Sequence, residues 1–445
     1  MEILQSLIKH QKKEKASFHM PGHKGRGAAF CAPFESEILS FDTTELSGTD
    51  CLCHPSDAIL RSQKWAATLY GAKEAFYLVN GSTSGILSMF DAFFSEGDAV
   101  LVDRACHRSV VNALSLCGLV PIYIAPPTDR KKGVPKGFDK EKIAEALKAY
   151  PEVRGVFLTS PNYYGMVSEL KEIAELVHAS GKVLLVDEAH GAHFPFSKHF
   201  PTGAIRAGAD ASVVSLHKSL PSPNQTALLL LREEDSDGRV RRAVNTFQTS
   251  SPSYVLLSCM EQALSYAETH GEEATERFLS MSEKCSKYRT EDPFKLLLKF
   301  DGEGYRAEEI LRERYGIYAE LCDRNHILLM CSWQNSEADF ALLGEALSEL
   351  APLLKETLAE SDVNQFCEGK AELNPREVRK KESEWVLLSD CAGRISAQTV
   401  TAFPPCIPIL MPGENITKEQ IDEIAKRTEY QALDGVKEGK LLVIK

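Results

Sequence analysis

Seven short apolar runs alternate with helical patterns between about residues 57 and 231. Each run is almost continuously apolar, which is typical of strands that are covered on both faces. Between two of the runs, Leu170, Ile173, Ala174 and Val177 stand at i, i+3, i+4 and i+7, the stripe of an amphipathic helix. The pattern predicts an α/β domain with a mostly parallel seven-stranded sheet wrapped by helices. Its strands are expected at 75–79, 99–102, 121–125, 155–159, 183–186, 212–215 and 227–231.

Polar and reactive side chains follow five of these runs. In wound α/β sheets, ligands bind beyond the carboxyl ends of the strands, where the connecting loops lie. We therefore expect five loops to meet at one rim of the sheet. They are 80–85, 103–108, 160–165, 187–190 and 215–218.

The pattern changes after a helical stretch near 254–275. Five further segments read as strand, helix, strand, strand and helix: 294–300, 307–315, 318–322, 326–331 and 340–350. A polar, charged break at 360–384 precedes a tail with an apolar run at 385–388 and a proline-rich run at 403–408. We expect an N-terminal arm (1–56), a large domain (57–290), a small α/β domain (291–355) and a C-terminal domain (356–445), so that smaller α+β units follow the large one.

Composition excludes several classes of protein. The 445 residues carry a formal net charge of −12 without a basic stripe, so nucleic-acid binding lacks its electrostatic footprint. No apolar stretch reaches the ~20 residues of a membrane span, and no export signal is visible at the amino terminus. The twelve cysteines are scattered, and the Cys51-Leu52-Cys53-His54 cluster lacks four-ligand spacing. We therefore predict no metal and a reducing, cytoplasmic location.

Two residues at the ends of apolar runs indicate pyridoxal phosphate chemistry. Lys218 lies in Ser215-Leu216-His217-Lys218, where it would hold the cofactor aldehyde as a Schiff base. Asp187 would keep the pyridine nitrogen protonated, so that the ring accepts electrons. The alternatives are a surface lysine and a carboxylate in a structural salt bridge with an arginine or lysine.

The segment Asn80-Gly81-Ser82-Thr83-Ser84-Gly85 stands between a strand and a helix. Its small residues allow backbone N–H groups to close around an anion, its hydroxyls add donors, and the helix dipole favours negative charge. Ser215 and His217 are placed to donate to the same phosphate. A simple helix cap is the alternative for the first segment.

Three histidines fall in the predicted loops. His107 would lie flat against the cofactor ring or face solvent as a helix-start residue, and the two readings are balanced. His190 and His193 follow Asp187 on one loop. Either is compatible with a structural role, which we favour for His193.

Eight segments occur in an order that matches one known family over nearly the whole chain. Together they resemble the bacterial Orn/Lys/Arg decarboxylases, which are pyridoxal phosphate enzymes of the aspartate-aminotransferase fold type (fold type I). The segments are Met20-Pro21-Gly22-His23-Lys24, Asp42-Thr43-Thr44-Glu45-Leu46, Asn80-Gly81-Ser82-Thr83-Ser84, Asp103-Arg104-Ala105-Cys106-His107, Asp187-Glu188-Ala189-His190-Gly191-Ala192-His193, Ser215-Leu216-His217-Lys218, Gln248-Thr249-Ser250-Ser251-Pro252-Ser253 and Phe403-Pro404-Pro405-Cys406-Ile407-Pro408.

The resemblance implies a role for each matching residue. Lys218 is the Schiff-base lysine, Asp187 lies at the pyridine nitrogen, and His107 stacks on the ring. His190 lies beside the ring near substrate, and Thr249 reaches the cofactor of a neighbouring subunit in a homodimer or larger homo-oligomer. The phosphate and the ring are expected to be held by Ser82, Thr83, Ser84, Ala189, Ser215 and His217. The chain resembles the compact biosynthetic form, without the amino-terminal wing domain of the larger members.

The implied activity is decarboxylation of lysine, arginine or ornithine to an amine and carbon dioxide. Cys51, Asn162 and Cys406 depart from the residues expected at their positions, so the substrate is left open among the three. The alternatives are another pyridoxal phosphate reaction on the same scaffold, such as an aminotransferase or lyase, and a non-catalytic regulatory paralogue.

Overall fold

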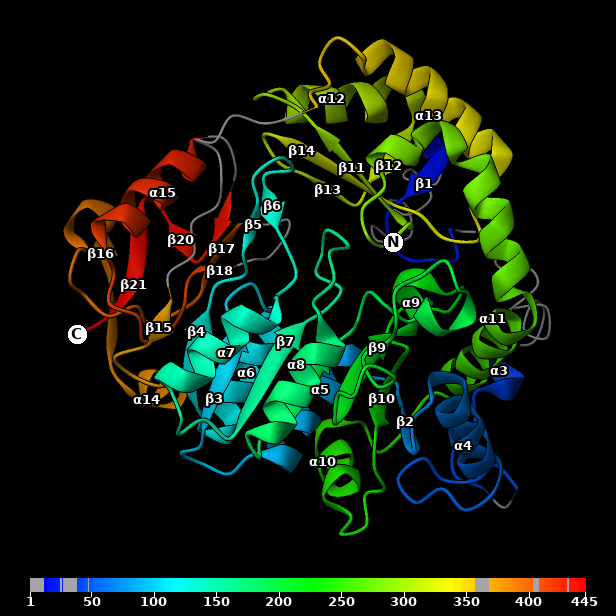
Figure 1. The fold of residues 1–445 in the computed structure, drawn as a ribbon, viewed down its shortest axis with the longest axis horizontal. Coiled ribbons are helices and arrows are strands. Elements are labelled where there is room, and N and C mark those ends of the chain that lie inside the picture. Colours follow the sequence, from blue (N-terminus) through cyan, green and yellow to red (C-terminus); the bar gives the residue numbers. More distant parts are fainter. Residues whose placement is uncertain are drawn as a thin grey trace.

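The computed structural model describes residues 12–24, 26, 38–46, 48–356, 368–402, 408–429 and 432–445. Its centre is a sheet with the strand order β15-β4-β3-β7-β8-β9-β10-β2 (Figure 1). The seven predicted apolar runs all form strands of this sheet. They are β2 (Glu74–Leu78), β3 (Ala99–Asp103), β4 (Val120–Ile124), β7 (Gly155–Thr159), β8 (Val183–Asp187), β9 (Ala211–Ser215) and β10 (Ala227–Leu231).

The sheet is parallel from β4 to β9, and β10 runs antiparallel to both of its neighbours. An eighth strand, β15 (Gly369–Lys370), pairs antiparallel with β4. The prediction of seven strands missed it, because two residues without an apolar run carry no strand signal. β2 points the same way as β9, so the five polar loops do share one edge.

Helices cover both faces of the sheet (Figure 1). Strand residues alternate between the faces, so Leu185 packs with one set of helices and Leu184 with the other. The first set is α5 (Gly81–Phe93), α6 (Arg108–Cys117) and α10 (Arg239–Phe247). The second face is covered by α7 (Lys140–Ala149), α8 (Leu170–Ala179), α4 (Ala58–Tyr70) and α11 (Tyr254–Met281).

A smaller sheet has the order β11-β14-β13. Its strands are β11 (Lys295–Lys299), β13 (Leu321–Cys322) and β14 (His326–Met330), flanked by α12 (Gly304–Ile310), a π-helical turn η4 (Leu311–Tyr315) and α13 (Glu337–Leu350). The single strand predicted at 318–322 is wrong. The chain forms β12 (Ile317–Ala319) and β13 instead, because β12 pairs with the distant β1 (Ala16–Phe18) whereas β13 pairs with β14.

The C-terminal part contains two three-stranded sheets and the helix α15 (Lys418–Thr428). The predicted polar break at 360–384 contains a helix, α14 (Pro375–Lys380), which begins with a reciprocal capping box between Asn374 and Glu377. Of the proline-rich run, 403–407 lie outside the described residues. The strands are β16 (Ser383–Leu387), β17 (Val400–Ala402), β18 (Pro408–Leu410), β19 (Leu433–Asp434), β20 (Val436–Lys437) and β21 (Lys440–Ile444).

Arg104 joins this C-terminal part to the large sheet. Its guanidinium is fully buried and donates to the carbonyl oxygens of Pro408 and Ile409 and to Glu414. The domain boundaries at residues 56, 290 and 355 stay predictions. The remaining short elements are α3 (Ile38–Phe41), β5 (Thr128–Asp129), β6 (Val134–Pro135), η2 (Phe194–Phe196), α9 (Leu216–Ser219), η3 (Glu283–Tyr288) and η6 (Leu388–Asp390).

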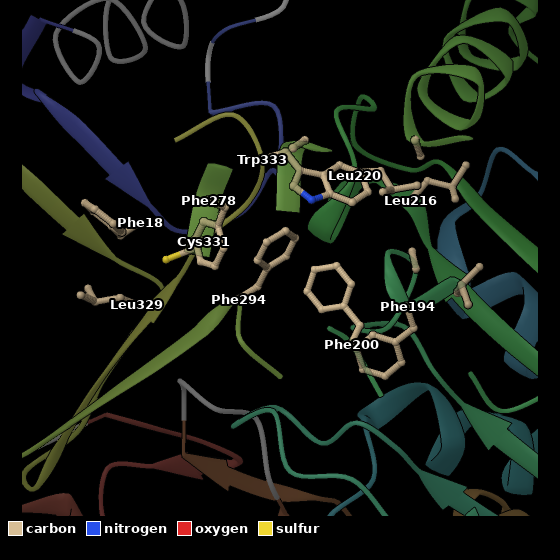
Figure 2. Packing of buried hydrophobic residues seen from close by; sticks show 14 of the residues in the cluster. Phe18, Phe194, Phe200, Leu216, Leu220, Phe278, Phe294, Leu329, Cys331 and Trp333 are labelled. Carbon is tan, nitrogen blue, oxygen red and sulfur yellow. The ribbon is translucent and has the colours of Figure 1, made fainter. Parts of the chain in front are cut away.

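One hydrophobic cluster connects the large sheet to the smaller one. Leu216 and Leu220 of the α9 region belong to the same cluster as Trp333, and in Figure 2 Phe294 is seen between Cys331 and Phe200. All six side chains are at most 8% exposed. The cluster fixes α9 and the start of β11 relative to each other. Within the described ranges, no helix combines the length and the apolar character needed to cross a membrane.

Candidate active site

Lys218 projects from the short helix α9, which follows β9 directly. We expected a loop at 215–218, but residues 216–219 form one helical turn with Leu220 as its C-cap. Leu216 and Leu220 are fully buried on either side of the half-buried Lys218. Burial of the two leucines therefore fixes the backbone from which the lysine extends.

The N-terminal segment packs on this turn. Gly22 donates its N–H to the carbonyl oxygen of His217 at 2.8 Å. A Cβ atom at position 22 would lie 2.7 Å from the Leu220 carbonyl oxygen and 2.8 Å from the Ser219 carbonyl carbon. Only glycine fits so close to the backbone of α9.

Asp187 is the last residue of β8 and is 4% exposed. Its Oδ1 accepts the Ala189 N–H at 3.0 Å. Burial raises the pKa of Asp187, and the positive charge of Lys218 opposes that increase. The predicted aspartate and lysine are therefore close enough to interact, and Ala189 lies beside them.

His190 lies between two lysines. Its Nε2 is 3.1 Å from Lys218 Nζ and its Nδ1 is 3.0 Å from Lys295 Nζ. The Tyr163 ring packs edge-on against the imidazole at a centroid distance of 5.1 Å. The pKa of His190 is well below its usual value, mainly because the ring is buried and also because Lys218 and Lys295 are positively charged. The ring is therefore neutral.

The amino end of α5 supplies the predicted anion site. Asn80 is the N-cap but its side chain does not bond the helix, and Gly81 has a φ of 74°. As first-turn residues, Ser82 and Thr83 have N–H groups without a partner inside the helix. The buried hydroxyl of Ser84 donates to the Gly81 carbonyl at 2.8 Å, and a contact of Ser84 with the cofactor stays a prediction.

Ser215 and His217 complete this side of the site. Ser215 Oγ is buried and has no hydrogen-bond partner among the described residues, which is costly unless a ligand provides one. His217 Nδ1 donates to the Thr226 carbonyl at 3.2 Å, so the neutral ring presents a lone pair at Nε2. Burial lowers the pKa of His217 to about 4. The predicted donation to a phosphate thus requires an additional proton on this ring.

His107 and Thr249 lie at the same edge. His107 is the N-cap of α6, and its Nδ1 accepts the Ser109 N–H at 3.2 Å. The pKa of His107 is lowered, mainly by desolvation and to a smaller extent by the charge of Lys218, although the ring stays accessible to solvent. The Thr249 N–H is 3.5 Å from Asn80 Oδ1. Its contact with a second subunit stays a prediction.

Three site residues were missed by sequence analysis. Glu320 Oε1 accepts the Tyr163 hydroxyl at 2.6 Å, and its Oε2 accepts the Met20 N–H at 2.7 Å. Lys295 contacts His190 from β11. Tyr163 lies in the loop expected at 160–165, but its residue type alone gives it no role. Glu320 interrupts an apolar run and Lys295 begins one, and neither signal indicates a site by itself.

His193 has the structural role that we favoured. It is fully buried, it contacts Asp292 Oδ1 through Nε2 at 3.0 Å, and it stacks on Phe294 at 4.5 Å between centroids. Of the unusual residues, Asn162 accepts the N–H groups of Tyr164 and Met166 and so shapes the loop that carries Tyr163. Cys51 lies half-buried before α4, and Cys406 lies outside the described residues.

These residues fit pyridoxal phosphate. Free amides at the start of α5 and the unpartnered Ser215 hydroxyl suit a phosphate, Asp187 suits a protonated ring nitrogen, and the Lys218 amine suits an aldehyde. His107 borders the space between them. The contacts of these residues with the cofactor's phosphate, ring and aldehyde stay predictions, because His217 needs an additional proton to donate and the Ser84 hydroxyl is bonded to Gly81.

Comparison with known proteins agrees with this geometry. The profile of the "Orn/Lys/Arg decarboxylase, major domain" matches residues 2–302, and that of the corresponding C-terminal domain matches residues 361–429. An arginine decarboxylase of Halalkalibacterium halodurans is 33% identical and covers 94% of this chain and 91% of its own. An arginine decarboxylase of Bacillus subtilis is 32% identical, and the match covers 95% of this chain and 92% of the relative.

Among solved structures, the constitutive lysine decarboxylase of E. coli superposes with a TM-score of 0.77 at 17% identity, over 99% of this chain and 81% of that one. This likeness confirms the fold type. The chain belongs to the Orn/Lys/Arg decarboxylase family and is a pyridoxal phosphate-dependent decarboxylase of a basic amino acid.

Proposed function

We propose that this enzyme decarboxylates arginine, with Glu320 receiving the distal cation of the substrate. The two relatives described above, which match nearly the whole chain, both bear the name arginine decarboxylase. The position of Glu320 is the observation that supports a cationic side chain.

Glu320 lies between β12 and β13 and is held from two sides by neutral donors, the Tyr163 hydroxyl and the Met20 N–H. Among the described residues, no Lys, Arg or His nitrogen lies within 4 Å of its carboxylate. Its charge acts on His217, the neighbour of Lys218, and on Lys295. A rigid carboxylate without an ion-pair partner beside the reactive lysine suits a guanidinium, which forms two parallel hydrogen bonds with such a group.

Pyridoxal phosphate, when bound, supplies an electron-accepting ring that stabilises the charge left behind when the substrate loses carbon dioxide. Lys218 binds its aldehyde. Asp187 holds the proton on the ring nitrogen, because a buried carboxylate stabilises a neighbouring positive charge. Ser82, Thr83 and Ser215 hold the phosphate, and His107 borders the ring. Lys218, assisted by His190, holds the proton that the substrate carbon receives.

The active form is proposed to be a cytoplasmic homodimer whose site is completed at the subunit interface by Thr249. Three large apolar side chains, Ile38, Phe41 and Leu46, are 45–60% exposed on the N-terminal arm. Exposed apolar side chains of this size are suited to burial against a second copy. The nine described cysteines are all free, which fits a reducing compartment.

A substrate panel tests the proposal. The purified, cofactor-loaded protein is incubated with arginine, lysine and ornithine, and carbon dioxide and amine are both measured. We expect turnover of arginine with equal amounts of the two products, and no turnover by Lys218→Ala. Keto-acid formation contradicts decarboxylation, preference for lysine or ornithine contradicts the substrate, and cofactor binding without any turnover favours a regulatory protein.

Light scattering tests the assembly. We expect the mass of a dimer, and Phe41→Asp is expected to weaken it. A monomer with full activity contradicts a shared site.

A further inference from the structure

The contact between His190 and two lysine amines limits where protons can be placed. A neutral imidazole has one N–H group and one lone pair. An ammonium group can only donate, so it must face the lone pair. Because both ring nitrogens of His190 face a lysine amine, at 3.1 Å and 3.0 Å, only one of Lys218 and Lys295 is an ammonium while the ring is neutral. The other is a neutral amine that accepts the ring N–H.

Lys295 is held firmly in this position. It is 1% exposed, and its backbone N–H donates to Asp292 while its carbonyl accepts the Thr290 N–H. A Cβ atom on Gly165 would lie 2.6 Å from the Lys295 Cγ, so the stem has no free space on that side. The amine cannot withdraw from His190 into solvent.

Several charged groups act on Lys295. Burial lowers its pKa to about 8, while the carboxylates of Asp292 and Glu320 raise it and the charge of Lys218 lowers it again. The Cys331 thiol and the ammonium of Lys24 also face it. Lys295 is therefore an amine that gains and loses a proton close to physiological pH.

We propose that Lys295 is a positioning residue that exchanges one proton with Lys218 through His190. In one direction, a Lys295 N–H bond breaks as an Nδ1–H bond forms, and the Nε2–H bond breaks as an N–H bond forms on Lys218. The reverse exchange leaves Lys218 as a neutral amine, the form that attacks an aldehyde. No proton enters or leaves this group of three side chains, Lys218, His190 and Lys295, which we name the relay.

The inference rests on the proposed role of Lys218 in cofactor capture, and it is tested on that step rather than on turnover. The full-length chain, freed of cofactor, is mixed with pyridoxal phosphate, and the rate constant of capture is followed by visible absorbance between about pH 6 and pH 9. A lone lysine loses roughly tenfold in neutral amine per pH unit below its midpoint. In the native chain we expect a much shallower dependence, because Lys218 passes its proton to Lys295.

Two substitutions of Lys295 are expected to change the profile in opposite ways. Lys295→Met removes the acceptor, so capture falls about tenfold per pH unit below its midpoint. Lys295→Arg provides a donor that never loses its proton, so the ring N–H must face Lys218 and capture stays fast to lower pH. At each pH, the capture rate of a variant is divided by that of the native chain. Because the cofactor titrates in the same way in both reactions, its own titration cancels.

Lys24→Met is the matched control. Lys24 is buried to a similar extent and its Nζ donates to the carbonyl oxygens of His19 and Met330, so its removal deletes a nearby cation and leaves His190 untouched. We expect a shallow profile for this variant. Circular dichroism checks the fold of each variant. If a Lys295 variant fails to fold, the pH dependence of the native chain alone tests the relay.

The possible results separate the relay from the proposed function. Three results for the pH dependence of the capture rate would each overturn the relay. The native chain could show a steep dependence, or Lys295→Met and Lys295→Arg could show parallel ones. Alternatively, Lys24→Met could depend on pH as steeply as Lys295→Met. Opposite shifts that vanish in a His190→Phe background support it. Capture at the native rate by Lys218→Ala would instead overturn the assignment of Lys218.

Discussion

The Gly22 N–H donates a 2.8 Å hydrogen bond to the carbonyl oxygen of His217, the residue before Lys218, the proposed Schiff-base lysine. The two residues are separated by almost two hundred positions in the sequence, yet the glycine lies against the backbone of α9. The N-terminal segment thus acts as part of the support of the active site.

Gly22→Ala is expected to displace α9, because the new methyl group would meet the backbone of Ser219 and Leu220. Overpacking of this kind costs about 1–3 kcal/mol. We expect a lower melting temperature and a weaker affinity for pyridoxal phosphate. The control is Gly344→Ala in α13, where a Cβ atom meets nothing within 4 Å, and which should gain up to about 1 kcal/mol. Equal melting temperatures and cofactor affinities for the native chain and Gly22→Ala would contradict the argument.

Asp187→Asn retains the shape of the side chain but removes the charge that is proposed to hold a proton on the cofactor ring. Loss of one electrostatic contact to the reacting group costs about 10²- to 10³-fold in kcat. Cofactor should still bind, as its absorbance would show. Asp103→Asn is the control, because this buried carboxyl at the end of β3 accepts the N–H groups of Ala105 and Thr159. A similar loss in both variants would argue against a specific role of Asp187.

Glu320→Gln tests recognition of the substrate cation. The amide keeps one acceptor and loses the charge, so we expect KM for arginine to rise about tenfold or more with a smaller change in kcat. Glu349→Gln, a surface carboxylate that contacts Arg314 and Tyr315, is the matched control and should behave as the native enzyme. An unchanged KM in Glu320→Gln would remove the main support for arginine binding at this residue.

Ser215→Ala should have opposite effects on the free and cofactor-bound protein. Without cofactor, deletion of an unpartnered buried hydroxyl is neutral or stabilises by up to about 1 kcal/mol. With cofactor, the variant should lose one contact to the phosphate and bind more weakly. Thermal unfolding with and without pyridoxal phosphate measures both. Ser88→Ala, whose hydroxyl already donates to the Ser84 carbonyl, should destabilise both forms alike.

Glu188 links stability to pH. Burial raises its pKa from 4.5 to about 8, opposed by hydrogen bonds from the Ala204 N–H and the Ser212 hydroxyl. The folded chain therefore binds this proton more tightly than the unfolded chain, so the contribution is complete below pH 4.5 and is lost as pH rises toward about 8.

Glu188→Gln removes this titration. The free energy of unfolding is measured in urea between pH 4.5 and about pH 8. We expect it to decline less steeply in the variant than in the native chain, the slopes differing by up to about 1.4 kcal/mol per pH unit. A pH dependence identical to the native one would show that Glu188 keeps an ordinary pKa in the folded protein.

The sequence was most informative where burial covers both faces of an element. The continuous apolar runs predicted every strand of the main sheet except β15, and the parallel topology then brought Asp187 and Lys218 to one edge. The start of α5, where we propose that the phosphate binds, was also predicted from local residue types, because a helix start needs only its own neighbours.

The remaining site residues depend on contacts that are distant in sequence. Lys295 meets His190 from another sheet, and Glu320 is positioned by Tyr163 and Met20. No local pattern reports such pairings. Similarly, the division of 318–322 into β12 and β13 follows from β1, which lies three hundred residues earlier.

The pairing of β1 with β12 has a consequence for biosynthesis. Ala16 leaves the ribosome early, but its partner Ile317 is made about three hundred residues later. Until then the first strand has no neighbour, and Gly22 has no fixed place against the lysine-bearing turn. Vitamin capture is therefore a late event in the maturation of each newly made polypeptide, after most of the chain has been translated.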